Sequence, residues 1–200
     1  MATPSCKRRD LIRLLSTAII SPVASPALSL TPPSSGQDNA PIYVPNGTGE
    51  RLKIGGGRMT FKLQKAQTHG HLAVAEATLA PGFLGAPPHL HRTFDEICFV
   101  LEGSVQVLVG DRVFDLKAGD LHLRPRGVMH TFWNSSRQPS KCLEFSIPGG
   151  HEEYLKDISL LLSKGVSPKP EDFAELEKRH DIVYFPNKLP ELMQKYHVHL

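Results

Sequence analysis

Two segments of the chain carry histidine, glutamate and turn-forming residues at fixed spacings, and together they predict one metal site. The first segment contains His89, His91, Glu96 and Gly103, separated by one, four and six residues. The second segment contains Gly119, the Pro125-Arg126-Gly127 turn, His130 and Asn134, separated by five, two and three residues. Three imidazoles and one carboxylate, punctuated by turn-forming residues, are typical of a ligand set built on short β-strands.

The spacing has a geometric reason. Residues two apart on a strand point to the same side, so His89 and His91 can hold one ion together. The two prolines before His89 keep this approach extended. Glu96 follows a short turn and should reach the same point from the next strand, and His130 should reach it from a third segment. Neutral imidazole and carboxylate suit Fe, Mn, Ni, Cu, Zn or Co, and such a site keeps coordination positions open for chemistry.

Two other histidine pairs have the same spacing but lack the complete pattern. They are His69 with His71 and His197 with His199. The first pair does have a glutamate, Glu76, five residues on, but Phe83 stands where the His89 segment has Gly103. Neither pair has its own proline-glycine turn leading to another histidine. We interpret the first pair as hairpin-turn residues and expect the second to lie in a frayed chain end.

The middle of the chain reads as many short strands separated by turn signals. The predicted strands are Arg58–Leu63, His71–Leu79, Glu96–Leu101, Ser104–Val109, Arg112–Leu116, Leu121–Arg124, His130–Trp133 and Lys141–Ile147. Gly110-Asp111 between two apolar runs predicts a hairpin. Short strands at close, regular spacing predict an all-β sandwich or barrel over residues 57–148.

Beyond residue 148 the period of the apolar residues changes. Apolar side chains between Tyr154 and Leu162 recur three or four apart, which predicts a helix. A proline-rich break at 167–172 precedes a second predicted helix through Phe173 and Leu176, and Pro190 opens a short third one. We expect this 149–200 helical extension to pack on the barrel or on a second subunit, since it cannot fold alone.

The first residues predict export. A basic start, a short apolar run and small residues near position 29 are typical of a secretory signal peptide over residues 1–29. The run from Arg8 and Arg9 to Arg13 is similar to a twin-arginine signal, although Lys7 stands where that signal usually has Ser or Thr. We expect a periplasmic or extracellular protein, the alternative being a cytoplasmic one with a basic tail. Residues 30–56, rich in proline, glycine and serine, are interpreted as a linker.

Charge and hydropathy exclude two classes of partner. The first thirteen residues account for the whole net charge of +3, so the remainder is formally neutral. No basic patch is therefore expected for nucleic acid. No segment after the leader is long and apolar enough to span a bilayer.

Cys98 and Cys142, both in predicted strands, are expected to be buried and free, although an exported chain could pair them.

The two motifs resemble those of the cupin superfamily. His89, His91, Glu96 and Gly103 match the first cupin motif, and Gly119, Pro125, Gly127, His130 and Asn134 match the second. The leading glycine, Gly82, lies one residue further from His89 than is usual. The resemblance implies a double-stranded β-barrel (jelly roll) with a C-terminal helical tail, and it implies His89, His91, Glu96 and His130 as metal ligands. The whole chain is similar to single-domain bacterial cupins described as quercetin-dioxygenase-like, which also implies a homodimer.

Three functions are compatible with this pattern. The first is a divalent-metal dioxygenase acting on a small organic substrate such as a flavonol or phenol, with Glu96 as ligand and candidate general base. The second is a metal-dependent isomerase or lyase of a sugar or keto compound, which needs no oxygen. The third is a non-catalytic module that binds a small ligand.

The residues near the ligands allow alternatives that the sequence leaves open. Phe132 and Val128 share strand parity with His130 and should face its cavity, where Phe132 could be a substrate wall or simple packing. Either Leu121 and Leu123 face inward and Arg124 is solvated, which we expect, or Arg124 faces inward and could bind an anionic group.

Overall fold

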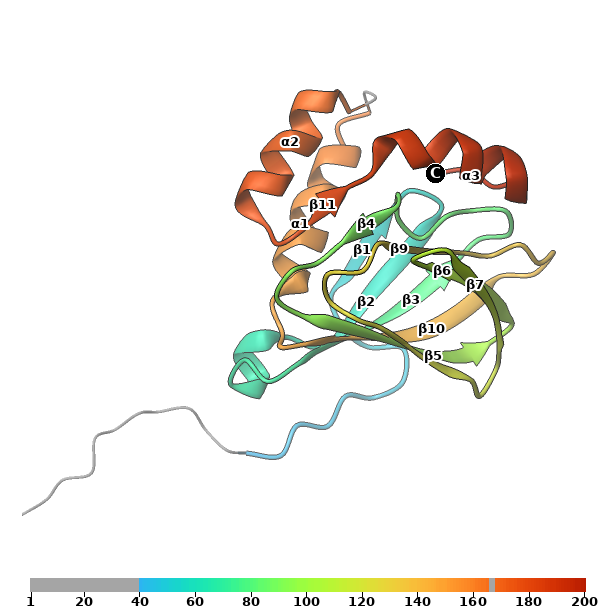
Figure 1. Cartoon of the computed structure of the whole chain (residues 1–200). Helices are drawn as coiled ribbons and strands as arrows, with labels where there is room; N and C mark the ends of the chain where they lie inside the picture. The colour runs from blue at the N-terminus through green and yellow to red at the C-terminus, as the bar shows by residue number, and fades with distance from the viewer. Residues whose placement is uncertain (1–39, 166–167) are drawn as a thin grey trace, which may run out of the picture. The chain divides into compact units, whose positions relative to one another are not determined.

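Two antiparallel β-sheets face each other in the computed structural model, which describes residues 40–165 and 168–200 (Figure 1). The first sheet has the order β1-β2-β3-β10-β5-β8, with strands β1 (Arg51–Ile54), β2 (Gly57–Leu63), β3 (Ala73–Leu79), β10 (Ser140–Ile147), β5 (Asp95–Glu102) and β8 (Leu121–Arg124). The second has the order β11-β4-β9-β6-β7, with strands β11 (Val183–Tyr184), β4 (His89–Leu90), β9 (His130–Trp133), β6 (Ser104–Val109) and β7 (Arg112–Lys117). The predicted all-β class is confirmed, and the sheets form a jelly-roll barrel.

Burial alternates along strands such as β5 and β10, which places one set of side chains in the core. All eight predicted strands are present, with bounds within two residues of those expected. The predicted hairpin joins β6 to β7, with Val109 paired to Arg112. Gly110 adopts a φ of 57° in this turn, a backbone conformation that favours glycine. Inward-facing side chains of both sheets then make the barrel core, which includes Val100, Val105, Val107 and Phe132.

Three strands were not predicted. Strand β1 lies within the range interpreted as a linker and pairs with β2. Strand β4 has two residues, among them the candidate ligand His89, and β11 comes from the C-terminal extension. Strand β11 pairs with β4 so that Tyr184 lies opposite His89. The extension therefore completes the sheet beside a candidate ligand.

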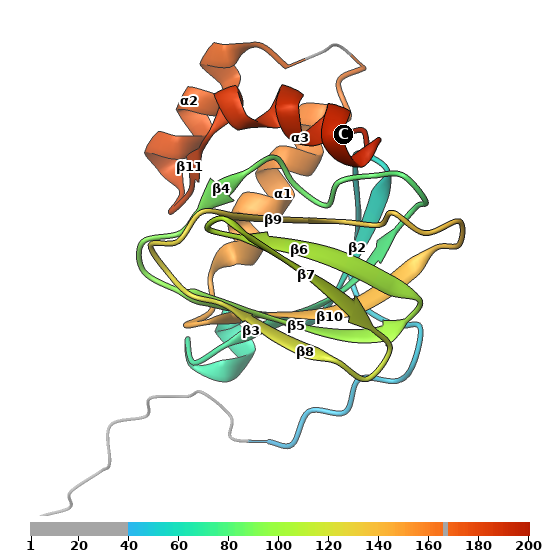
Figure 2. The same ribbon diagram turned by 45° about the vertical axis from the view of Figure 1, so that its right-hand side comes forward.

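The C-terminal extension covers one side of the barrel. Its helices are α1 (His151–Leu162), α2 (Pro170–Arg179), the 3-10 turn η2 (Pro186–Lys188) and α3 (Leu189–Tyr196), and a further 3-10 turn, η1 (Lys65–Thr68), lies between β2 and β3. Figure 2 shows the three α-helices together on the side of the barrel where β4 and β11 lie. The buried faces of α1 and α2 share an apolar cluster that includes Tyr154, Ile158, Leu176 and Ile182. The extension thus packs on its own barrel, one of the two arrangements expected.

The expectation of a frayed C-terminus is wrong. The His199 amide donates to Gly82 O at 2.8 Å, and the Leu84 amide donates to His199 O at 2.7 Å. Val198 is buried against Leu84, Trp133 and α3 in a further apolar cluster. These contacts hold the last residues against the barrel because they provide backbone pairing and apolar burial together.

The signal peptide expected at residues 1–29 lies outside the described residues and stays a prediction. Cys98 on β5 and Cys142 on β10 are buried free thiols. In the described part of the chain, no helix combines the length and apolar character needed to cross a bilayer.

Candidate metal centre

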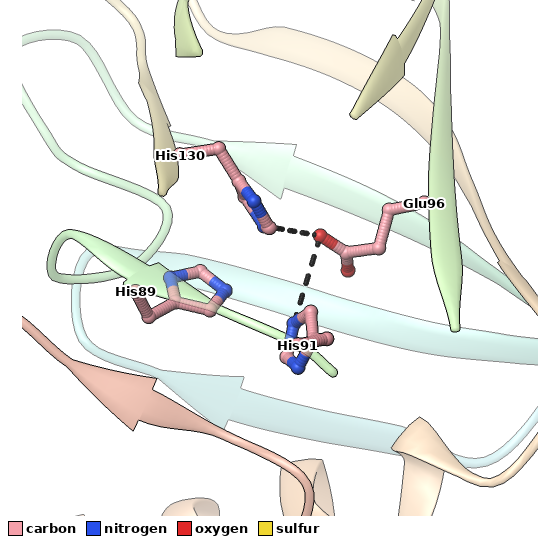
Figure 3. Close-up of side chains that lie close together, drawn as sticks. All are labelled: His89, His91, Glu96 and His130. Atoms are coloured by element: carbon pink, nitrogen blue, oxygen red, sulfur yellow. Dashed lines mark hydrogen bonds and ion pairs between the residues drawn. The ribbon is translucent and has the colours of Figure 1, made fainter. Parts of the chain in front are cut away.

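The structure brings the four predicted ligands together inside the barrel. His89 belongs to β4 and His91 follows it directly, Glu96 belongs to β5, and His130 opens β9. All four are buried, and their ligand atoms lie within 4.8 Å of one another. Figure 3 shows the three imidazoles and the carboxylate converging on one point. Backbone pairing sets this geometry in part, since His89 lies directly opposite His130 across β4 and β9.

Each candidate histidine ligand is oriented by a backbone carbonyl. In all three rings Nδ1 lies 2.5–3.0 Å from a carbonyl oxygen. The carbonyls belong to Pro87 for His89, Asp181 for His91 and Val128 for His130. A carbonyl oxygen only accepts, so each Nδ1 carries a proton, and a ring in its neutral form then keeps its lone pair on Nε2. This is the arrangement in which metal-binding histidines are usually held.

The Nε2 atoms and the Glu96 carboxylate oxygen that face one another in the cluster are suited to bind a cation. Glu96 Oε2 lies 2.8 Å from His130 Nε2 and 3.8 Å from His91 Nε2. With the proton on Nδ1, each pair brings two acceptors face to face, which is repulsive without a positive charge between them. His91 Nε2 is also buried with no hydrogen-bond partner among the described residues. Three imidazole nitrogens and one carboxylate therefore fit a divalent transition metal.

The protonation states also suit a metal. Burial lowers the pKa of His89 well below its usual value, and it lowers the pKa of His91 as well. Burial raises the pKa of Glu96, but nearby groups, the Arg124 guanidinium first among them, outweigh this effect and hold that pKa well below its usual value. Neutral imidazoles and an ionised carboxylate are the forms that bind metal ions.

Arg124 overturns the expected orientation of β8. Its side chain is buried at 1% exposure, whereas Leu121 and Leu123 are 62% and 49% exposed. The guanidinium forms a buried ion pair with Glu144, and its Nη1 lies 3.7 Å from Glu96 Oε2. Two carboxylates on neighbouring strands stabilise Arg124 inside the barrel. The apolar residues of β8 alone do not predict this inward orientation. Arg124 therefore faces inward, and its ion-pair partners are Glu144 and Glu96 of the protein itself.

A cavity of about 520 Å³ adjoins the cluster. His89 and Glu96 line it together with Arg124, Glu144 and His151. Most of its wall is apolar, including Phe61, Leu79, Leu84, Phe132, Leu155 and Ile158.

Phe132 belongs to this wall, as its strand parity predicts. Val128 is not among the lining residues, because it precedes β9 and the alternation of that strand does not reach it. Gly85 makes room for Phe132, since a Cβ at that position would lie 2.1 Å from the phenylalanine ring.

Two residues near the site were missed by the sequence analysis. His151, the first residue of α1, lies with Nε2 3.8 Å from Glu96 Oε1. Asp181 precedes β11, and its carboxylate accepts hydrogen bonds from the amides of Arg92 and Thr93 and from the Thr93 hydroxyl. Both come from the C-terminal extension, where no motif marks them. The only local signal was the position of His151 directly after the glycine pair that ends the barrel.

The other two histidine pairs lie apart from the cluster. His69 and His71 are exposed beside η1, where His69 adopts a φ of 54° as a helix C-cap. His197 and His199 are exposed at the end of α3. The interpretation of these pairs as non-ligands agrees with their placement outside the buried cluster.

Comparison with known proteins supports the same fold. Residues 75–146 match the family model described as the Cupin domain. A putative germin-like protein 9-2 of Oryza sativa subsp. japonica is 29% identical over 120 residues, which cover 49% of this chain and 56% of that protein. Germin-like protein subfamily 2 member 2 of Arabidopsis thaliana is 32% identical over 77 residues, covering 36% of this chain and 35% of that protein. The matched part of the chain therefore spans about half of the length of the first relative and about a third of the second.

A solved structure extends the comparison to the fold. The structure of KdgF from Halomonas sp. superposes with a TM-score of 0.50 at 18% identity, covering 56% of this chain and 99% of that one. At this identity the likeness concerns the fold and not the activity. Together with the two packed sheets, it shows that the chain has the jelly-roll fold found in cupins, and the family match over residues 75–146 agrees with this fold.

Proposed function

We propose that the protein is a metal-dependent cupin enzyme, an oxygenase that acts on a small, largely apolar organic molecule such as a phenol or flavonol. The observation that carries the proposal is the apolar cavity that adjoins the buried cluster of three histidines and one glutamate. A cavity of about 520 Å³ lies within the size range of small-molecule sites.

The four clustered side chains would hold the ion. His89, His91 and His130 would bind through Nε2, and Glu96 through Oε2, the oxygen that faces His130 and His91. A bound transition metal would supply a Lewis acid and a site where dioxygen and a substrate oxygen can meet. The Glu96 carboxylate, held ionised by the nearby Arg124 guanidinium, can also accept a proton from a substrate hydroxyl. Apolar walls around the cluster exclude water from the reacting groups.

The cavity wall favours an aromatic or aliphatic substrate over a sugar. A sugar presents several hydroxyl groups, and each needs a polar partner when it is buried. The wall instead offers side chains such as Phe61, Leu79 and Phe132, with Arg124 and Glu144 already paired to each other. This disfavours a sugar isomerase but not a keto-compound isomerase or lyase, which would use the same cluster without oxygen.

Oxygen uptake tests the proposal. Protein loaded separately with Fe²⁺, Mn²⁺, Ni²⁺, Cu²⁺, Zn²⁺ and Co²⁺ is screened against flavonols, catechols and diketones. We expect oxygen consumption matched to substrate loss, absent in Glu96→Ala and retained in His71→Ala, whose histidine is exposed away from the cluster. Substrate conversion that proceeds equally well without oxygen would replace the oxygenase with an isomerase or lyase. Full turnover and full metal occupancy in Glu96→Ala would contradict the assignment of the site.

A further inference from the structure

We propose that His151 is a substrate-binding residue, which hydrogen-bonds a second oxygen of a molecule whose first oxygen is held at the metal centre. The proposal rests on the function proposed above and deepens it. It predicts a preference for molecules that carry two neighbouring oxygen atoms on an apolar body.

The His151 imidazole borders the same cavity as the candidate ligands. Its Nε2 lies 3.8 Å from Glu96 Oε1, the carboxylate oxygen that does not face His130. Among the described residues the structure gives the ring of His151 no hydrogen bond, and 3.8 Å is too long for one. The ring therefore keeps a donor and an acceptor available to a ligand in the cavity.

Aromatic neighbours fix the orientation of this ring. His151 stacks on Tyr154 with centroids 5.1 Å apart and planes 20° apart. Phe94 lies at 5.2 Å and His91 at 4.8 Å, the latter in an edge-on arrangement. The Tyr154 hydroxyl is itself within 2.6 Å of the Tyr184 hydroxyl, which holds the stacking partner in place. A group held this rigidly loses little conformational entropy when a ligand binds.

The position distinguishes His151 from a fifth ligand. The ligand atoms that gather within 4.8 Å of one another belong to His89, His91, Glu96 and His130. His151 stands beside Glu96 and His91 on the wall formed by α1, while most of the remaining wall is apolar. A molecule bound at the centre thus meets two polar contacts close together and an apolar surface for its body. Vicinal diols on an aromatic ring have this chemistry.

Two related probes test the inference without requiring turnover. The Co²⁺-loaded protein is titrated anaerobically with catechol, which has two neighbouring hydroxyls, and with phenol, which has one, while the visible absorption of cobalt is followed. We expect the wild-type protein to bind catechol more tightly than phenol. His151→Phe, which keeps an aromatic ring against Tyr154, should weaken catechol binding about tenfold and leave phenol binding unchanged, as expected for one lost hydrogen bond. His151→Gln, which keeps a donor, should recover part of the loss.

The controls separate His151 from structure and from the proposed function. His180→Ala removes a histidine that also contacts Tyr154 but does not line the cavity, and it should bind both probes like the wild type. An unchanged catechol preference in His151→Phe would overturn the inference, as would loss of bound cobalt from that variant. A wild-type protein that binds no cobalt would overturn both proposals. If catechol binding depends on His151 but no oxygen is consumed, only the proposed oxygenase activity would be contradicted.

Discussion

At the scale of single residues, Arg124 shows how burial and charge are balanced around the candidate centre. Its guanidinium lies between Glu144 and Glu96, on the wall of a largely apolar cavity. Burial lowers the pKa of Arg124, but the two carboxylates outweigh this and raise it above its usual value. Burial raises the pKa of Glu144, so this carboxylate depends on Arg124 to remain ionised.

Removing one member of this buried pair should be costly. We expect Glu144→Ala to lower the free energy of unfolding by about 3 kcal/mol, because it leaves a buried guanidinium with one distant partner. Urea denaturation of the apo protein measures the change. The matched control is Glu102→Ala, which breaks an ion pair with Lys141 at the surface and should leave the free energy of unfolding nearly unchanged. Equal effects of the two substitutions would contradict a structural role for the Arg124–Glu144 pair.

The buried histidines predict a pH dependence of the apo protein. Burial lowers the folded-state pKa of His89 and His91, and it lowers the pKa of His151 to about 3. The unfolded chain then binds more protons than the folded one below about pH 6.5, so stability falls as the pH drops. Between pH 6.5 and 5 each such histidine should cost about 1–2 kcal/mol. Thermal unfolding of metal-free protein measures this fall, which should be smaller in His151→Phe; a flat profile would contradict the buried neutral state.

At the scale of elements, the C-terminal extension supports a candidate ligand from outside the barrel. The Asp181 carbonyl accepts the hydrogen bond of His91 Nδ1 at 2.5 Å, and its carboxylate binds the backbone just after His91. Strand β11 then pairs with β4. Both contacts orient His91 toward the cluster.

Weakening this support should weaken metal binding while all four ligands remain. We expect Asp181→Ala to reduce Co²⁺ affinity about tenfold or more, as loss of groups that orient metal ligands commonly does. Competition with a chromophoric chelator measures the affinity. Asp181→Asn keeps a side-chain acceptor and should lose less, whereas an Asp181→Ala protein with wild-type affinity would show that the loop holds its position without the carboxylate.

The elements also show which features the sequence could predict. Strands such as β5 and β10 have alternating side chains, so their bounds followed from local pattern. Strand β4 has two residues after a pair of prolines, and β11 has two residues between helices, so neither has a period to detect. On β8 the pattern was present but its inward face depends on Glu144 and Glu96, which lie on other strands. Long-range charge pairing of this kind is not visible in a local period.

At the scale of the whole molecule, the barrel and the C-terminal extension share apolar clusters. Leu192 and Val198 are buried against Leu84 and Trp133, and α1 with α2 forms a second cluster that includes Ile54 of β1. The cluster of the four candidate ligands could be predicted because these residues follow one another at fixed offsets in two motifs. His151 and Asp181 could not, since only the folding of a distant segment brings them to the site.

Loss of the last helix should therefore destabilise the barrel wall. Removing residues 189–200 exposes Trp133 and Leu84 and deletes the backbone bonds that join His199 to Gly82 and Leu84. We expect a lower melting temperature and binding of a hydrophobic dye by the truncated chain. In the full chain, Leu192→Ala should cost about 2–5 kcal/mol, whereas Gln194→Ala on the exposed face of α3 should cost little. An equally stable truncated chain would contradict this account of the extension.

The central claim is that His89, His91, Glu96 and His130 bind one metal ion, and elemental analysis tests it most directly. Purified protein is loaded with excess Co²⁺, passed through a desalting column and analysed for metal per chain. We predict about one ion per wild-type chain, retained in His71→Ala and lost in His130→Ala. A wild-type chain that retains no metal, or a folded His130→Ala chain that retains all of it, would contradict the account.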